Sequence, residues 1–343
     1  MRKKIGLLGC GYSVPTHVRY NDDPIFRDMR YEPNSQGIVE RDLFTGNRER
    51  RYLHSTERIE TLMIEASRQA LAHAHLQPDM VDRLYGYATV SPYLTPNALY
   101  EIHRELGLPQ HALVTPINNE FSTFLTGIIH AYEAIAAGHS RYALVVCGTN
   151  WSKHMDYSQG HSFSIGDGAG AAVVGVHDAF SFVDYTVQTR SEQYGAMTMH
   201  IHPTLLHGHS QIPVDEQDGM PIPTYTIQPE EGIQSFQQAM PGPAEMIKKL
   251  LKKHGLHGDD IALITHQGSR LLLDYWKKEL QPNEYLETME QFGNMTLATY
   301  PVNLAYYQDK ITSKYILLIA VGVGYHQVAL LLKRKRLTPF ART

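Results

Sequence analysis

Apolar residues recur along the chain at two spacings, which predict strands that alternate with helices. Apolar runs of strand length lie at residues 5–11, 82–90, 111–117 and 142–147. Residues 57–73 place apolar side chains at positions i, i+3, i+4 and i+7, and Ser55 or Thr56 would cap that helix. The same spacing predicts a helix over residues 121–138. This alternation favours an α/β fold.

The second half of the chain repeats the plan of the first. The matching pairs of segments are residues 75–87 and 254–266, 141–146 and 314–319, and 166–174 and 322–330. Self-similarity of this kind predicts an internal duplication. We therefore expect two halves, residues 1–176 and residues 177–343, with one sheet and its packed helices in each.

Residues 199–230 interrupt this plan and predict a long loop, which could serve as a lid or a binding loop. The segment holds four histidines, which are His200, His202, His207 and His209. Histidines can bind a metal ion, but no carboxylate or cysteine completes an obvious ligand set here. We therefore expect a polar loop without a metal ion.

Composition narrows the classes of function. The 343 residues are 43% hydrophobic and carry a formal net charge of −4, so the basic field that nucleic-acid binding needs is missing. We expect the basic run at residues 333–336 to be a solvated tail. Cys10 and Cys147 are the two cysteines; we expect both to be packing residues in a reducing, cytoplasmic setting. No segment approaches the roughly 20 apolar residues of a membrane span.

The start of the helix at residue 121 is the place where chemistry is expected. A predicted strand runs into a helix N-terminus there, and the helix dipole and free backbone N–H groups favour an activated thiol or hydroxyl at such a position. The residue at this point is Phe121, which offers neither a nucleophile nor a proton, and Ser122 follows it. The sequence therefore leaves open whether the protein is an enzyme.

Five segments together resemble the β-ketoacyl-ACP synthase III proteins of the thiolase superfamily, over nearly the whole chain. They are residues 45–51, 121–138, 165–171, 265–267 and 292–296. Each match is weak to moderate alone, but all occur in the family's order and at its spacing. The resemblance implies a duplicated, five-layer αβαβα thiolase fold with two central mixed sheets, and it implies a dimer.

The resemblance also implies roles for individual residues. The family's nucleophilic cysteine falls on Phe121, whereas His266 and Asn294 match the His and Asn that hold a thioester carbonyl as negative charge develops. Two departures stand out. Ser269 replaces the last Asn of the family's His-Gln-Ala-Asn motif, and the tryptophan expected before residue 45 is not recognisable.

Each of these residues also has a structural interpretation. His266 could be a buried structural histidine, Asn294 could be a turn residue, and residues 166–170 are expected to form mainly a tight turn. Arg48, Arg50 and Arg51 could contact a phosphate of coenzyme A or of an acyl carrier. A solvated loop explains the three arginines equally well.

We expect a function in acyl-thioester metabolism of the fatty-acid, polyketide or secondary-metabolite type. The favoured hypothesis is a non-acylating partner subunit of a condensing enzyme, in a homodimer or with a cysteine-bearing homologue. The substrate would be a thioester of coenzyme A or of a carrier phosphopantetheine, with no permanently bound cofactor.

Three alternatives stay open. Ser122 could serve an acyltransferase or hydrolase together with His266, although a shift of one residue rotates a helical side chain by about 100°. His266 and Asn294 could decarboxylate a malonyl thioester without covalent capture. From another class, the chain could be a non-catalytic carrier-binding or scaffold protein.

Overall fold

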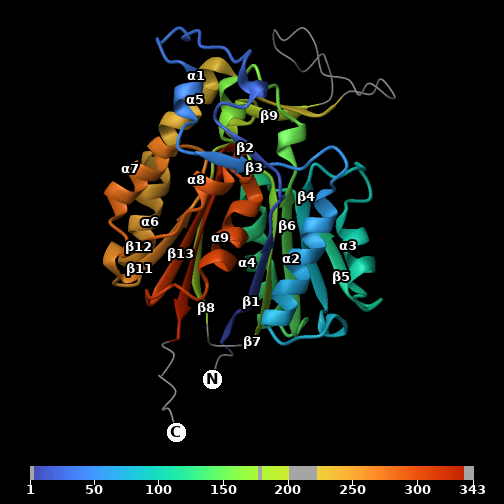
Figure 1. Ribbon diagram of the computed structural model, residues 1–343. Coiled ribbons are helices and arrows are strands. Elements are labelled where there is room, and N and C mark those ends of the chain that lie inside the picture. The colour runs from blue at the N-terminus through green and yellow to red at the C-terminus, as the bar shows by residue number, and fades with distance from the viewer. Residues whose placement is uncertain (1–3, 177–179, 201–221, 336–343) are drawn as a thin grey trace.

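The computed structural model describes residues 4–176, 180–200 and 222–335, which are built around a ten-stranded mixed sheet (Figure 1). From one edge inward, the strands are β5 (Leu113–Pro116), β4 (Arg83–Thr89), β6 (Tyr142–Thr149), β7 (Gly168–Val176) and β1 (Ile5–Ser13). From the other edge inward, they are β12 (Glu284–Tyr285), β11 (Ile261–Thr265), β13 (Tyr315–Gly322), β14 (His326–Arg334) and β8 (Phe180–Thr189). The two halves have the same strand order, as an internal duplication would produce. The predicted division between residues 176 and 177 falls between β7 and β8 and stays a prediction.

The two halves of the sheet meet at β1 and β8. These strands pair antiparallel through Gly6 with Ser181 and through Leu7 with Phe180. Glycine is needed at position 6 because a Cβ there would lie 2.0 Å from the Phe180 carbonyl oxygen. Each half is mixed, since β4 runs parallel to β6 whereas β7 runs antiparallel to it. The two sheets that the resemblance implies are thus present as halves of one hydrogen-bonded sheet.

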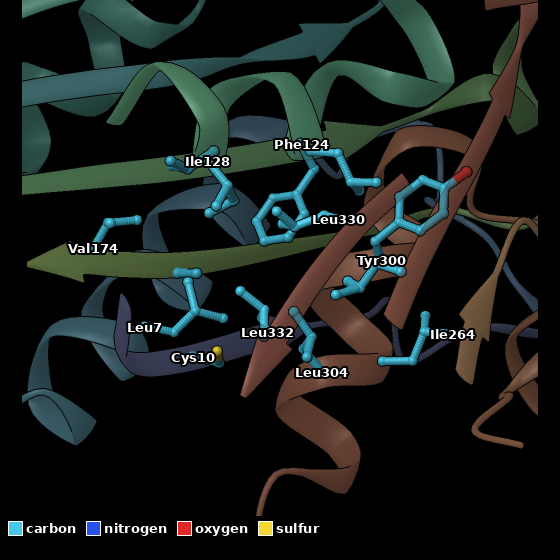
Figure 2. Packing of buried hydrophobic residues seen from close by; sticks show 14 of the residues in the cluster. Leu7, Cys10, Phe124, Ile128, Val174, Ile264, Tyr300, Leu304, Leu330 and Leu332 are labelled. Carbon is cyan, nitrogen blue, oxygen red and sulfur yellow. The ribbon is translucent and has the colours of Figure 1, made fainter. Parts of the chain in front are cut away.

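Helices cover the outer faces of the two halves and fill the space between them. The outer helices are α2 (Ile59–His73) and α3 (Leu99–Leu106) on the first half, and α6 (Pro241–Lys253) and α7 (Arg270–Leu280) on the second. Between the halves lie α4 (Thr123–Ala136) and α9 (Thr299–Tyr307). Phe124 of α4, Leu304 of α9 and Leu330 of β14 belong to one apolar cluster there (Figure 2). The layers therefore follow the expected αβαβα order.

Short elements surround the site end of the molecule. They are β2 (Val18–Tyr20), α1 (Glu40–Leu43), β3 (Glu49–Arg51), β9 (Met197–His200), β10 (Thr224–Ile227), α5 (Pro229–Ala239) and α8 (Met289–Phe292). Among the described residues, none of the helices combines the length and the apolarity that crossing a bilayer demands.

Two local expectations were wrong. α2 begins after Arg58, and its N-terminus receives no side-chain cap from Ser55 or Thr56, because the turn at residues 54–57 separates them from the helix. The expected loop at residues 199–230 is shorter at both ends. His200 ends β9, β10 pairs with β9, and Pro229 starts α5. The remaining histidines of that segment, His202, His207 and His209, lie outside the described residues.

Candidate active site

A sharp turn leads into α4 and presents Phe121. The turn is one 3₁₀ unit, Glu120–Ser122, and Glu120 has φ +38°, in the left-handed region that L side chains rarely adopt. The second half has the same turn before α9, where Thr296 has φ +44°. The turn is therefore a property of the repeated fold.

The Phe121 side chain is enclosed by aromatic rings. It stacks on the His266 imidazole, with ring centroids 4.8 Å apart and planes 11° from parallel. Its centroid lies 5.3 Å from that of Trp151, and Tyr225 belongs to the same apolar cluster. The benzyl group, 6% exposed, thus fills the position that the resemblance assigns to a nucleophile.

His266 follows β11 and reaches this stack from the second half of the molecule. Burial lowers the pKa of its imidazole to about 4, so the ring is neutral at pH 7. Within the described residues, its Nδ1 atom has no hydrogen-bond partner. Packing therefore holds the ring, and a neutral imidazole can still donate one hydrogen bond to a ligand.

Asn294 is fixed by backbone bonds on both sides. Its N–H donates to the Ser164 carbonyl at 2.7 Å, and its carbonyl accepts from Gly166 N–H at 3.0 Å. Its side-chain Oδ1 accepts from Thr296 N–H at 3.0 Å. The amide oxygen is thus engaged, which leaves Nδ2 as the donor that faces the space beside Gly268.

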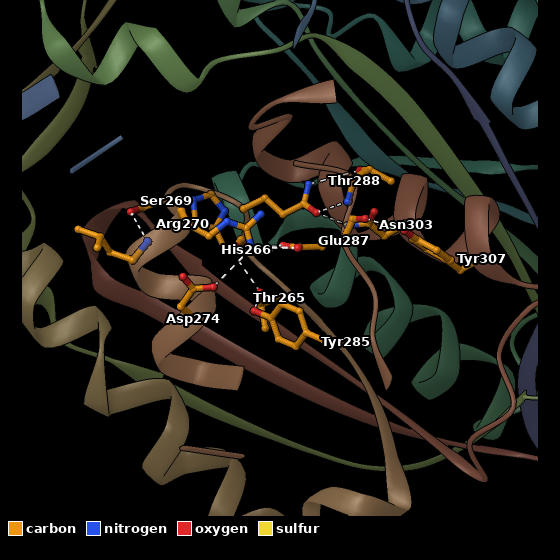
Figure 3. A network of polar contacts seen from close by, with 12 residues as sticks. Thr265, His266, Ser269, Arg270, Asp274, Tyr285, Glu287, Thr288, Asn303 and Tyr307 are labelled. Atoms are coloured by element: carbon orange, nitrogen blue, oxygen red, sulfur yellow. Dashed lines mark hydrogen bonds and ion pairs between the residues drawn. The ribbon is translucent and has the colours of Figure 1, made fainter. Parts of the chain in front are cut away.

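A polar network supports the segment that carries His266 (Figure 3). Gln267 Oε1 accepts from Thr288 N–H at 2.7 Å and from Asn303 Nδ2 at 3.0 Å. Ser269 caps α7, since its Oγ accepts from Leu271 N–H at 3.2 Å. The serine that departs from the family motif therefore has a clear local role.

A cavity of about 80 Å³ adjoins these groups. Phe121, Trp151, His266 and Asn294 line it, and its wall is mostly apolar. A neighbouring cavity of about 260 Å³ shares part of this wall. The residues common to both are Phe44, Met197, Ile227 and Phe236. No lysine or arginine among the described residues lines the smaller cavity.

Ser122, the expected alternative nucleophile, points elsewhere. It is fully buried, and its Oγ donates to the Asn119 carbonyl at 2.8 Å. It does not line the cavity that holds His266 and Asn294. The rotation of one helical step therefore places this hydroxyl against its own turn.

The three arginines of residues 48–51 differ in how deeply they are buried. Arg50 is fully buried and donates to the Phe163 carbonyl at 2.6 Å and to Asn21 Oδ1 at 2.8 Å, and burial lowers its pKa to about 10. The chain itself therefore surrounds this guanidinium, and the contact with a carrier phosphate, one of the two interpretations of the three arginines, stays a prediction. Arg48 lies at the surface near Glu290, and Arg51 lies near Glu49.

Two buried carboxyls near the site were not singled out from the sequence. Glu120 precedes Phe121, its Oε2 has no partner among the described residues, and burial raises its pKa to about 7. The signal was an acidic residue at the start of an apolar helix. Asp167 accepts from Leu53 N–H at 2.8 Å and from Ser152 N–H at 3.0 Å, which ties the turn before β7 to two other segments.

The cysteines are remote from this chemistry. Both are buried in strands of the first half, and burial raises the pKa of Cys10 to about 12 and raises that of Cys147 as well. In the described ranges, no cluster of three or more His, Cys, Asp or Glu side chains could hold a metal ion.

Comparisons with known proteins agree with this architecture. The family model for 3-oxoacyl-[acyl-carrier-protein] synthase III matches residues 116–191, and the model for the C-terminal part of that synthase matches residues 251–334. A β-ketoacyl-[acyl-carrier-protein] synthase III from Desulfitobacterium hafniense (strain Y51) is 30% identical over 306 residues, covering 88% of each chain. The synthase III from Rhodospirillum centenum is 29% identical over 329 residues, covering 93% of this chain and 95% of its own.

A solved structure shows the same fold. The 3-oxoacyl-[acyl-carrier-protein] synthase III of Aquifex aeolicus superposes with a TM-score of 0.79 at 20% identity, covering 96% of this chain and 99% of that one. The fold, the two family models and the sequence relatives agree along most of the chain. The chain belongs to the β-ketoacyl-[acyl-carrier-protein] synthase III family of the thiolase superfamily.

Proposed function

We propose that this chain is a condensing-enzyme homologue that does not become acylated and that acts as the partner subunit of a cysteine-bearing homologue. The observation that carries the proposal is the position of Phe121. Its ring occupies the end of the turn before α4 and stacks on His266. Beside it remains a cavity of about 80 Å³. A benzyl group can form no thioester, so the first half-reaction of a condensing enzyme has no acceptor at this point.

Other side chains do not replace the missing nucleophile. Ser122 donates its hydroxyl to the Asn119 carbonyl, and both cysteines have raised pKa values within buried strands. Ser235 does line the cavity, but its Oγ donates to Gln193 Oε1 at 2.7 Å, so it has an amide partner and no base. A serine nucleophile needs an adjacent general base.

The partner role is supported by the edge of the first half-sheet. β5 is the outermost strand there, and Leu113 at its start is 51% exposed. An exposed edge strand is a ready template for pairing with another chain. The substrate would be an acyl thioester of coenzyme A or of an acyl carrier, shaped in part by this chain and captured by the cysteine of the other.

Intact mass spectrometry tests the proposal. The wild-type chain is incubated with acetyl-CoA, alone and together with a synthase III homologue that has the cysteine. We expect the acetyl adduct on the homologue and none on this chain, and a stable complex of the two by native mass. An adduct on the wild-type chain, or full condensing activity of its homodimer, would contradict the proposal. Phe121→Cys is the matched variant, because it returns a thiol to the same turn.

A second candidate is favoured by the two donors that remain. His266 and Asn294 both line the cavity, and a pair of N–H donors can hold the thioester carbonyl of a malonyl group while CO₂ leaves. This activity needs no covalent capture. It predicts CO₂ release from malonyl-CoA that falls by about 10²-fold or more in His266→Ala and in Asn294→Ala. Equal release from the wild type and both variants would exclude it.

A further inference from the structure

Gly268 lies against the imidazole of His266. A Cβ added at Gly268 would be 2.9 Å from His266 Nε2 and 3.1 Å from its Cδ2, and the first distance is shorter than real Cβ contacts allow. The backbone of Gly268 does not have a positive φ, unlike that of eight other glycines. Glycine is therefore needed at this position for the space it leaves, and the imidazole uses that space.

Phe121 confines the same imidazole from one face. The two rings are nearly parallel, with centroids 4.8 Å apart, and His266 as a residue is 7% exposed. Because Nδ1 lacks a hydrogen-bond partner among the described residues, no polar contact of that atom fixes the orientation of the ring. One contact lies on the ring face and the other on the ring edge, so the two together define where Nε2 points.

We propose that Phe121 and Gly268 are a matched pair of positioning residues that hold His266 in one orientation. The aromatic ring covers one face of the imidazole, and the absent side chain at residue 268 leaves room for its Nε2 edge. Asn294 shares this space, since its Nδ2 lies 3.8 Å from the same Cβ position. The pair therefore sets how the two donors of the site converge. The inference goes beyond the proposed function, because it holds whether the chain acts as a partner subunit or as a decarboxylase.

The proposal predicts that changes at the two positions are not additive. Gly268→Ala in the wild type crowds the edge of the imidazole, and the Phe121 ring blocks its movement on one face, so we expect Tm to fall by about 2–4 °C. In a Phe121→Ala background the ring can move into the vacated space. The same Gly268→Ala change should then cost about 1 °C or less.

The matched control is Gly322→Ala. Gly322 lines the same cavity, and a Cβ there would lie 3.5 Å from Phe121 Cβ, at ordinary contact distance and without a positive φ. Its effect on Tm should be small and should add to that of Phe121→Ala. If Gly268→Ala alone does not fold, Phe121→Ala/Gly268→Ala must fold. A double variant that fails like the single one overturns the proposal.

NMR titration measures the pKa of the His266 imidazole, which should not change if Phe121 and Gly268 have only a structural role. The imidazole has a pKa of about 4 because it is buried. We expect this pKa to rise toward its ordinary value in Phe121→Ala, to change in Gly268→Ala, and to stay unchanged in Gly322→Ala. Additive Tm changes, or a His266 pKa that is the same in all four proteins, would rule the matched pair out. Neither outcome depends on whether an acyl adduct forms.

Discussion

Glu120 precedes Phe121 in the chain and His266 stacks on the Phe121 ring, and burial moves the pKa values of the two side chains in opposite directions. The carboxyl of Glu120 has a pKa raised to about 7, and the imidazole of His266 has a pKa lowered to about 4. Both shifts favour the neutral form. Between these two pH values both groups are therefore uncharged, and His266 lines a cavity whose wall is mostly apolar.

The shift of Glu120 predicts a pH dependence of stability. Its native pKa of about 7 exceeds the ordinary value of 4.5, so between these values the native state holds a proton that the unfolded state releases. The free energy of unfolding should therefore fall as pH rises through this window, with a slope of up to about 1.4 kcal/mol per pH unit from this group.

Urea unfolding at pH 5 and pH 8 measures this effect. Glu120→Gln keeps the shape but cannot ionise, so it should gain stability over the wild type at pH 8 and lose that gain at pH 5. Glu192→Gln changes an exposed carboxylate and should follow the wild type at both values. An equal difference between Glu120→Gln and the wild type at the two pH values would show that Glu120 is not a buried acid.

At the scale of elements, the start of α7 shows why a departure from the family motif can be conservative. Ser269 stands where the family has asparagine, and its Oγ accepts from Leu271 N–H. Serine and asparagine are both favourable N-cap residues, because each offers a short side-chain oxygen to the first helical turn. The change therefore preserves the helix that anchors His266, although it alters the side chain.

Removing this cap should destabilise the protein modestly. Ser269→Ala loses the bond to Leu271 N–H and should lower the free energy of unfolding by about 1 kcal/mol. Ser269→Asn should keep most of that stability. Chemical denaturation of the three proteins provides the comparison. A loss as large in Ser269→Asn as in Ser269→Ala would mean that the hydroxyl does more than cap the helix.

At the scale of the whole molecule, the sequence predicted most strands of the duplicated halves. It did not predict features that depend on contacts between residues far apart in the chain. Apolar runs located β1, β4, β5 and β6 of the first half, because burial leaves a local pattern, and self-similarity indicated β11, β13 and β14 of the second. No local pattern predicted β8 or β12. The joining of the halves at Gly6 depends on a close approach to Phe180, 174 positions away, and no local pattern encodes it. The burial of Arg50 was not foreseen for the same reason, since it depends on a hydrogen bond to the Phe163 carbonyl in a distant segment.

The same distinction holds for the candidate site: its residues could be predicted from the sequence, but the packing of their side chains could not. The family's spacing placed Phe121, His266 and Asn294 at one site, and all three line a single cavity. The stack between Phe121 and His266 was not foreseen, because the geometry of two rings depends on the packing of both halves. The close contact between Gly268 and His266 was not predicted either, since a glycine after a strand is usually explained by a turn.

The turn that presents Phe121 has a counterpart in the second half, where Leu297 follows Thr296 as Phe121 follows Glu120. An ancestral duplication gives two elbows of the same shape, and a reactive residue in one of them is what distinguishes the copies. With Phe121, both elbows of this chain end in apolar side chains. The two turns therefore match in backbone conformation and in the apolar character of the residue after the left-handed position, so Leu297 is an internal reference for Phe121.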